Sequence, residues 1–296
     1  MKPFLKWAGG KRWLAYRLGI SKLDGVKKYI EPFVGSGAIF FHFQPENSIL
    51  NDFNKNLVNT YKAIRDNVNE VVSILESHQK CHSAEYYYNI RNKRMEKMEE
   101  KAAQFIYLNR TCWNGLYREN KFGEFNVPKG TKDKVIFPDD DFISASMALK
   151  NAELYSDDFE AVIEKSNEGD LIFADPPYTV KHNRNGFLKY NEKIFSWDDQ
   201  IRLRDCILRA SQRGVKIVMT NAYHTSISCI YEPFAEITPL ERHSVLSAKK
   251  NYRSTTQESL ITINIRADEI LSKKRARIYY PDAEKNIDIQ MAETNI

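Results

Sequence analysis

Short apolar runs alternate along the chain with longer segments whose apolar residues recur at helical spacing. The short runs predict β-strands, since strands commonly span about 4–8 residues between polar or turn-forming positions. They cover residues 28–33, 48–52, 152–156, 170–174, 215–219 and 258–265. Helical spacing covers residues 54–75, 85–108 and 198–212. Strands that alternate with helices are typical of an α/β protein with a parallel, doubly wound sheet, and we expect that fold.

Changes of pattern divide the chain into three parts. We expect a discontinuous core from residues 1–56 and 152–270, with a mainly helical subdomain, residues 57–151, inserted between its halves. Inside that subdomain, residues 109–130 are rich in Asn, Gly, Arg and aromatic side chains, which favours a loop or hairpin. Residues 271–296 form a polar C-terminal tail.

Composition places the chain among folded proteins outside the membrane. Hydrophobic residues make up 42% of its 296 residues and charged residues 28%, which suffices for a core. No window approaches 18 consecutive apolar residues, so we expect no membrane span. The first residues lack a secretory signal pattern, so we expect a cytoplasmic protein. The net charge of +5 leans mildly toward a polyanionic partner.

Side chains that could bind a metal ion do not form a recognisable site in the sequence. The four cysteines lie far apart and include no Cys-x-x-Cys pair. His78, Cys81 and His82 lie close together but lack a fourth ligand at a recognisable spacing. We interpret this group as a polar loop after a helix and expect no metal ion.

A glycine-rich turn, Phe33-Val-Gly-Ser-Gly37, follows the first predicted strand. Glycines here let the backbone approach a nucleotide, and the next helix offers free amide groups. Asp52 ends the second strand, near the spacing of a carboxylate that accepts from ribose hydroxyls, although it could instead cap the helix that follows. These residues indicate a cofactor that contains adenosine. Phe40 stands where a dinucleotide fingerprint has its third glycine, which argues against an NAD-dependent oxidoreductase.

The motif Asp175-Pro-Pro-Tyr178 follows the apolar strand at 170–174. It therefore lies at the carboxyl end of a strand, where open α/β sheets bind ligands. Its prolines remove two amide donors and stiffen the turn. Asp175 and the carbonyl of Pro176 can each accept one hydrogen of an amine, and Tyr178 can stack on a ring. The motif suits a flat substrate with an exocyclic amine.

Four blocks, in this order, resemble those of Dam-type DNA adenine methyltransferases. They are FLKWAGGK (4–11), EPFVGSG (31–37), NRTCWNGLYRENKFGEFNVP (109–128) and DPPY (175–178). The resemblance spans about residues 4–265 and implies a site-specific, adenine-specific DNA methyltransferase. It also implies a Rossmann-like core that uses S-adenosylmethionine (AdoMet), an inserted target-recognition subdomain, and direct in-line transfer to a flipped-out adenine in duplex DNA.

The resemblance assigns roles at the catalytic and cofactor sites. Asp175, Pro176 and Tyr178 would hold the flipped base, and Lys11 would lie near the methionine end of AdoMet or the target adenine. Asp52 would hold the ribose hydroxyls. The other residues expected to bind the cofactor are Trp7, Ala8, Gly9, Gly10, Lys11, Glu31, Phe33, Gly35, Gly37, Asp158, Phe159 and Asp175.

The resemblance also assigns DNA contacts, and on this pattern we expect GATC as the target. Lys6 and Arg118 would contact guanines, and Trp113 would intercalate where most members of the family carry tyrosine. Asn114 would face the orphaned partner base. Leu116 and Pro128 would contact a thymine methyl group and neighbouring base edges. Such pairings suit the chemistry of the major groove. Asn120 and Asn126 would make backbone or structural contacts.

Several positions depart from the family pattern. Thr131 stands where some members carry a basic contact to phosphate, which nearby lysines could replace. Residues 180–197 and 246–256 do not resemble the GATC enzymes, so the reaction is better supported than the target sequence.

Two further functions use parts of the same pattern. A methyltransferase of ribosomal RNA, acting on adenine or guanine, could use a similar Asp-Pro-Pro-Tyr turn, although the recognition block favours DNA. A catalytically inactive DNA-binding relative could keep the fold, although Asp175, Tyr178 and Asp52 are intact. One recognition subdomain per chain is compatible with a monomer on a short palindrome. A restriction endonuclease paired with this enzyme would be a separate chain.

Overall fold

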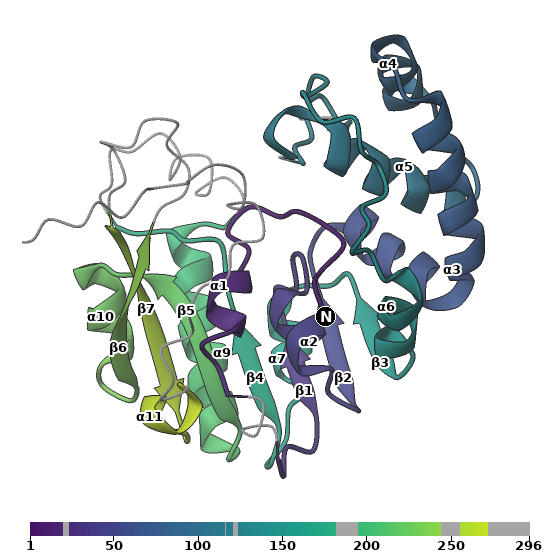
Figure 1. The fold of residues 1–296 in the computed structure, drawn as a ribbon. Coiled ribbons are helices and arrows are strands. Elements are labelled where there is room, and N and C mark those ends of the chain that lie inside the picture. The colour runs from purple at the N-terminus through teal and green to yellow at the C-terminus, as the bar shows by residue number, and fades with distance from the viewer. Residues whose placement is uncertain (20–23, 116, 121–123, 182–194, 244–254, 272–296) are drawn as a thin grey trace, which may run out of the picture.

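A seven-stranded sheet in the order β3-β2-β1-β4-β5-β7-β6 forms the centre of the molecule (Figure 1). The computed structural model describes residues 1–19, 24–115, 117–120, 124–181, 195–243 and 255–271. The strands are β1 (Tyr29–Glu31), β2 (Ser48–Asn51), β3 (Ala152–Tyr155), β4 (Leu171–Ala174), β5 (Lys216–Ala222), β6 (Glu236–His243) and β7 (Thr255–Ile263). The predicted mixed α/β architecture is confirmed.

The sheet changes direction at one edge. Strands β3, β2, β1, β4 and β5 are parallel, whereas β7 is antiparallel to β5 and β6 is antiparallel to β7. The prediction of a parallel sheet is therefore wrong for its last two strands. The apolar pattern does not predict β6, because Pro239 and several charged residues interrupt it, and proline is tolerated in an edge strand. The reversal places Glu258, near the beginning of β7, opposite Ala222 at the end of β5.

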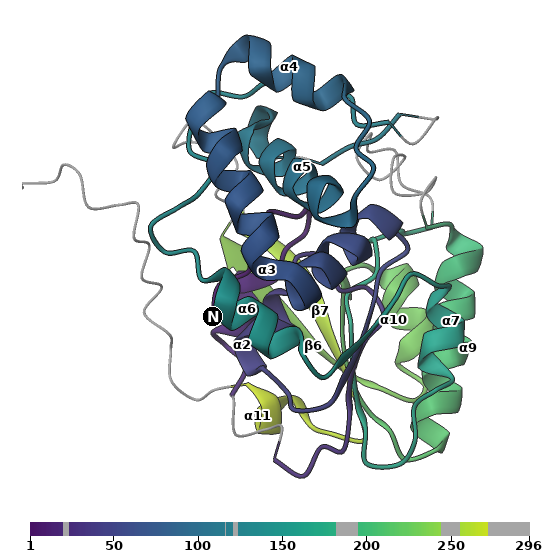
Figure 2. The same cartoon turned by 90° about the vertical axis from the view of Figure 1, so that its right-hand side faces the viewer.

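Helices cover both faces of the sheet (Figures 1 and 2). One layer includes α1 (Arg12–Ala15), α2 (Ala38–Phe43) and α11 (Ala267–Ile270), and the other contains α7 (Phe159–Ile163), α9 (Trp197–Gln212) and α10 (Thr225–Tyr231). Neighbouring strand residues alternate between the two cores, so that Phe173 packs in the first and Ile172 in the second. In the part of the chain that the structure describes, no helix is long and apolar enough to cross a membrane.

Between β2 and β3 the chain forms a helical region, residues 55–149. It contains α3 (Lys55–Cys81), α4 (Ala84–Asn92), α5 (Met98–Thr111), the 3₁₀ turn η2 (Trp113–Gly115) and α6 (Phe142–Leu149). The first half of α3 shares one core with the sheet, since Tyr61 belongs to the same buried cluster as Tyr29 of β1 and Leu50 of β2. The ring of Phe4 packs on Tyr61 and Phe142, at 5.6 Å from each. The division of this region into a separate subdomain stays a prediction.

The helix predicted over residues 85–108 is in fact two helices, α4 and α5. The amide of Gln104, on α5, donates to the carbonyls of Ile90 and Lys93 at 2.6 and 2.7 Å. The carbonyl of Ile90 also accepts from the N–H of Lys93, so the Gln104 bonds add to the backbone capping at the end of α4. A distant side chain therefore stabilises the break, and the local helical pattern does not reveal it.

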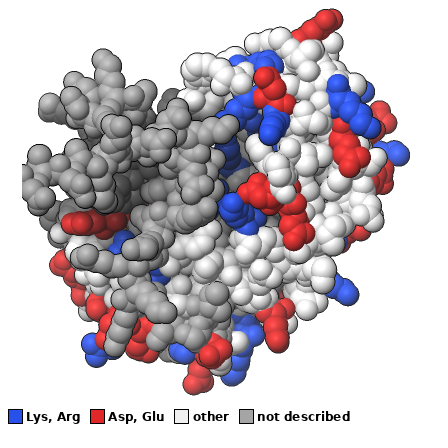
Figure 3. Space-filling view, in the orientation of Figure 1, with Lys and Arg blue, Asp and Glu red and all other residues white. Residues whose placement is uncertain are grey.

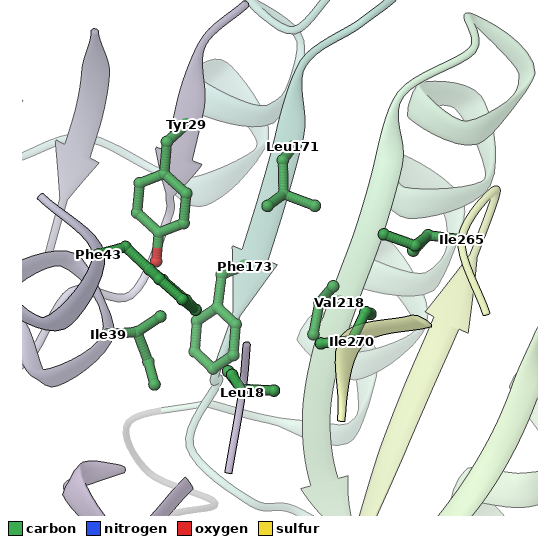
Figure 4. A pocket seen from close by; sticks show the side chains of 9 residues that line it. All are labelled: Leu18, Tyr29, Ile39, Phe43, Leu171, Phe173, Val218, Ile265 and Ile270. Carbon is green, nitrogen blue, oxygen red and sulfur yellow. The ribbon is translucent and has the colours of Figure 1, made fainter. Parts of the chain in front are cut away.

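A small cavity lies under α2, lined by apolar side chains that include Tyr29, Leu171 and Phe173 (Figure 4). Tyr29 and Leu171 begin β1 and β4, so the cavity lies away from the carboxyl ends of those strands. Its volume is about 20 Å³, enough for about one water molecule. It is too small for a nucleoside cofactor.

Candidate active site

Three loops that follow the carboxyl ends of β1, β2 and β4 lie side by side. The glycine loop, residues 32–37, follows β1, while Asp52 follows β2 and Asp175 follows β4. Because β1 pairs in parallel with both β2 and β4, the three loops meet at the carboxyl end of these strands. Doubly wound sheets bind ligands at such an edge.

The glycine loop has a conformation that glycine adopts readily. Gly35 and Gly37 have φ of +48° and +65°. A Cβ on Gly35 would lie 2.8 Å from Cδ1 of Trp7, so the indole packs directly on the loop. The N–H of Gly35 donates to Asp52 at 3.0 Å, and its carbonyl accepts from the hydroxyl of Tyr61 at 2.7 Å. The loop is thus fixed by three side chains.

Asp52 supports the loop and does not cap the helix after it. Its second carboxylate oxygen accepts from the N–H of Asn54 at 2.9 Å. Asn54 itself is the N-cap of α3, accepting from Leu57 at 3.0 Å, so the capping alternative for Asp52 is wrong. Burial raises the pKa of Asp52, while its two backbone donors oppose that shift.

Phe53, the next residue, is 82% exposed and was not predicted as part of a site. A large apolar ring in solvent beside a buried carboxylate offers a face to a flat ligand. Its position directly after the strand-ending acid is the feature of the sequence that could have identified it.

Glu31 lies beneath the glycine loop at the end of β1 and is buried. It accepts from the hydroxyl of Tyr29 at 3.0 Å. Burial raises the pKa of Glu31 well above its usual value, and the charges of Asp175 and Asp52 add to that shift. Three carboxyl groups therefore lie close together at this end of the sheet, and the shift favours the neutral form of Glu31.

Asp158 and Phe159 lie at the start of α7. The Asp158 carboxylate caps that helix, accepting from the N–H of Glu160 at 2.9 Å, and Arg202 donates to both of its oxygens at 2.7 and 2.8 Å. Phe159 is buried, and its ring lies 5.5 Å from that of Phe33. Phe159 thus contacts the glycine loop through Phe33, whereas Asp158 is held by Glu160 and Arg202.

Lys11, Asp175, Tyr178, Thr220 and Glu258 form what we call the catalytic cluster. The Lys11 ammonium lies 3.0 Å from Asp175 and 3.3 Å from Glu258, and donates to the carbonyl of Gly9 at 2.9 Å. Thr220 donates to Asp175 at 2.7 Å, and the Tyr178 hydroxyl donates to Glu258 at 2.8 Å. Lys11 also lies 4.9 Å from the centre of the Tyr178 ring.

Burial controls the protonation of this cluster. It raises the pKa of Asp175, opposed by the charge of Lys11 and the hydrogen bond from Thr220. It also raises the pKa of Tyr178 well above its usual value, so the phenol stays neutral and can donate. Sequence reasoning missed Thr220 and Glu258, because they lie on β5 and β7 and carry no local motif.

The first block of the resemblance connects the glycine loop with the helical region. The Trp7 indole stacks on Phe105, at 6.2 Å, and on Tyr117, at 5.9 Å. Asn109 pairs with the backbone of Lys6, accepting from its N–H at 2.9 Å and donating to its carbonyl at 2.8 Å. These contacts place the block between the glycine loop and the recognition block.

The structure assigns the opening of the recognition block to α5, so its first residues belong to a helix and not to the predicted loop or hairpin. Arg110 is 2% exposed, donates to the carbonyls of Phe4 and Val135, and forms an ion pair with Asp140. Arg110 is therefore part of the core.

Residues 113–128, here called the recognition turn, face solvent at several of the predicted DNA contacts. Trp113 is 54% exposed, Asn114 is exposed with φ of +57°, and Pro128 is exposed. Arg118 is exposed and donates to Asn126 at 3.1 Å. The isolated antiparallel bridges Cys112–Lys129 and Glu119–Phe125 connect the two sides of the turn. Asn120 bonds to Glu124, and Leu116 lies outside the described residues.

Lys6 lies against the recognition turn. Its side chain packs on Gly115, where an added Cβ would come within 2.6 Å of Cδ. Burial lowers the pKa of Lys6 to about 8, and the nearby charge of Lys132 adds to that shift.

The histidines of the group at residues 78–82 form hydrogen bonds with tyrosines. His78 and Cys81 belong to α3, so the interpretation of this group as a loop is wrong; the histidines contact the hydroxyls of Tyr86 and Tyr107 at 2.7 and 2.8 Å. Among the described residues, Glu160, Glu164 and Cys206 could converge on an ion, but arginines form ion pairs with both carboxylates.

On the face in Figure 3, acidic and basic side chains are interspersed.

Comparisons with known proteins identify the family. The family model for the D12 class N6 adenine-specific DNA methyltransferases matches residues 7–253. The chain is 34% identical over 271 residues to Type II methyltransferase M1.LlaDCHI of Lactococcus lactis subsp. cremoris, covering 88% of this chain and 95% of that protein. It is 34% identical over 287 residues to Type II methyltransferase M.MjaIII of Methanocaldococcus jannaschii, covering 89% and 99%.

A third relative is the DNA adenine methylase of Escherichia coli (strain K12). It is 29% identical over 231 residues, covering 74% of this chain and 80% of that protein. With the family model matched from the first block through β6, this chain belongs to the D12 class of N6 adenine-specific DNA methyltransferases.

Proposed function

We propose that this enzyme transfers a methyl group from AdoMet to the exocyclic amine of adenine within a short duplex DNA site, GATC. The observation that carries the proposal is the group at the end of β4 in which a buried Lys11 contacts the partly exposed Asp175 and Tyr178. Because β4 pairs with β1, an acceptor for an amine lies beside a nucleotide-binding loop.

The residues around the glycine loop fit AdoMet. The loop lets a ligand approach the backbone, and Asp52 keeps lone pairs for ribose hydroxyls beyond those that Gly35 and Asn54 occupy. Phe53 offers a ring face, while Asp158 and Phe159 border the adenine side. When bound, AdoMet supplies a methyl group on a positively charged sulfur.

Asp175 and the carbonyl of Pro176 would each accept one hydrogen of the adenine amine. This arrangement favours a pyramidal nitrogen whose lone pair is directed toward the glycine loop. Orientation and electrostatics are then the contribution of the protein. Asp175 need not remove a proton first, because the methylated nitrogen is acidic enough to lose one afterwards. The raised pKa of Asp175 suits it to accept that proton.

The target adenine must leave the base stack to reach this buried cluster. Trp113 would fill the vacated space, Asn114 would face the orphaned base, and Arg118 and Lys6 would contact guanines. The exposure of Trp113, Asn114 and Arg118 supports such roles, and Lys6 lies partly buried beside them, against Gly115. Leu116, Pro128, Asn120 and Asn126 complete the proposed set. We propose a monomer, with any cognate restriction endonuclease encoded as a separate chain.

The test uses purified protein, AdoMet and genomic DNA from a host that lacks adenine methylation, with modified adenines mapped by single-molecule sequencing. Modification at GATC supports the whole proposal. Modification at another short motif keeps the reaction and rejects GATC. Absence of modified adenine from DNA, with AdoMet bound, contradicts the proposal and makes structured RNA the next substrate to assay.

A further inference from the structure

Glu258 lies in the catalytic cluster although its strand belongs to a distant part of the chain. It is 6% exposed, 80 residues beyond Tyr178, and pairs with Ala222 at the end of β5. Because β7 is antiparallel to β5, its beginning lies at the edge where β4 and β5 end. Glu258, on the antiparallel strand β7, therefore reaches the motif at residues 175–178, which follows β4.

The contacts of Glu258 connect two groups expected to meet the target base. One oxygen, Oε2, accepts from the Tyr178 hydroxyl at 2.8 Å and lies 3.3 Å from the Lys11 ammonium. Lys11 lies 4.9 Å from the centre of the Tyr178 ring and pairs with Asp175. The same carboxylate therefore restrains the tilt of the ring and the position of the cation.

Electrostatics gives this carboxylate a second effect. The Lys11 side chain is 4% exposed, and a buried ammonium is costly unless it is paired. If Asp175 were its sole anionic partner, Lys11 would remain directed at the acceptor that the adenine amine requires. Glu258 shares the cation, so that Asp175 can exchange Lys11 for the amine while Lys11 keeps a counter-charge.

We propose that Glu258 is a positioning residue for the target adenine: it fixes the Tyr178 ring for stacking and holds Lys11 when the base binds Asp175. This inference rests on the proposed function, because it presupposes adenine in the cluster. It assigns to β7 a role in binding the base, beyond the sheet pairing that β7 also provides.

The experiment compares Glu258→Ala and Glu258→Gln with the wild-type enzyme, using duplex DNA that carries 2-aminopurine at the target position. Base extrusion is measured as the rise in 2-aminopurine fluorescence, and transfer as the single-turnover rate on adenine DNA. We expect Glu258→Ala to lose most of the fluorescence rise and about 100-fold in rate, the loss typical of misplaced reacting groups. Glu258→Gln keeps an acceptor for Tyr178 and should lose about 10-fold.

A double-variant cycle tests whether Glu258 acts through the phenol. Tyr178→Phe removes the hydroxyl, so Tyr178→Phe with Glu258→Ala should lose less than the product of the single losses. Glu241→Gln, an exposed carboxylate on β6, is the matched control and should leave both readouts unchanged.

Three results would overturn the inference. They are a normal fluorescence rise and rate in Glu258→Ala, fully multiplicative losses in the cycle, or losses explained by a parallel loss of AdoMet binding and thermal stability. Because wild-type DNA methylation is measured in the same series, a failure of the proposed function is seen separately, as an inactive wild-type enzyme.

Discussion

The catalytic cluster and the recognition turn differ in how their side chains are held before DNA binds. In the cluster, Lys11 and Glu258 are buried, and each of the five residues has a hydrogen bond or ion pair within the group. In the recognition turn, Trp113, Asn114 and Arg118 are exposed, and Arg118 contacts a neighbour within the turn. The fold holds the side chains of the catalytic cluster in place, whereas those of the recognition turn are accessible to a partner.

The difference follows from the work each group performs. Electrostatic catalysis depends on acceptors that are oriented in advance, so a buried and mutually bonded cluster is effective. Side chains that recognise base edges exchange contacts with water for contacts with DNA, so they remain accessible until DNA binds. Substitutions in the cluster should therefore change the rate of transfer, while substitutions in the turn should change DNA binding.

The largest expected effect tests the cluster. Asp175→Ala removes the acceptor for the adenine amine and should lower the single-turnover rate by about 1,000-fold, within the range for loss of a preorganised electrostatic group. AdoMet binding, measured by calorimetry, should survive. Asp198→Ala, an exposed carboxylate in the first turn of α9, serves as the control. Full activity of Asp175→Ala would refute the assignment of this motif.

The second prediction separates two arginines of the same sequence block. Arg110→Ala leaves the buried Asp140 without its partner and should destabilise the protein by about 3–5 kcal/mol in urea unfolding. Arg118→Ala should leave the free energy of unfolding unchanged and should relax discrimination at a guanine, worth about 1–3 kcal/mol. Equal stability losses in both variants would contradict the separation between core and recognition turn.

Removal of the exposed indole tests the recognition turn directly. Trp113→Ala should reduce kcat/KM for DNA by about 10- to 100-fold, because stacking on a base is worth about 1–3 kcal/mol. AdoMet affinity and thermal stability should not change. Met147→Ala removes another exposed apolar side chain, on α6, and is expected to be neutral. A loss of stability in Trp113→Ala would mean that the indole belongs to the fold.

A glycine pair tests the rigidity of the cofactor loop. Gly35→Ala combines positive φ with a Cβ 2.8 Å from the Trp7 ring, and should weaken AdoMet binding about 10-fold. Gly25 has φ of +76° and no described atom within 4 Å of an added Cβ. Gly25→Ala should therefore have a similar backbone strain of about 1–2 kcal/mol without the loss of AdoMet affinity. Equal affinities in the two variants would show that the contact with Trp7 is unimportant.

The local sequence predicts those parts of the molecule that neighbouring residues determine. The strands β1, β2, β3, β4 and β5, the glycine loop and the position of Asp175 follow from apolar runs and turn residues near each motif. The direction of β7 does not, because its alternating pattern suits a parallel or an antiparallel neighbour. At the break between α4 and α5, Gln104 of α5 donates to two carbonyls at the end of α4, a contact that helical spacing does not reveal.

The same limit applies to the candidate site. Lys11 and Asp175 occur in recognisable blocks, and the structure places their charged groups 3.0 Å apart. Thr220 and Glu258 join them through the pairing of β4, β5 and β7, which no local spacing reveals. Arg110 and Arg118 lie in one block with opposite environments, because burial is decided by the packing of α5 and not by residue type.

The smallest expected effect concerns Lys6, which packs beside the recognition turn while its neighbouring residues form the cofactor block. Its pKa of about 8 means that its charged fraction falls about fourfold between pH 7 and pH 8.5, whereas an ordinary lysine stays charged. If charged Lys6 contacts DNA, the affinity for DNA should fall about fourfold between pH 7 and pH 8.5. The reason is that neutral Lys6 must take up a proton before it can make this contact. Lys6→Arg remains charged and should give a flat profile, and Lys6→Gln should be flat at lower affinity. An unchanged decline in Lys6→Gln would assign the titration to another group, and Lys6 would then belong with the buried residues of the fold.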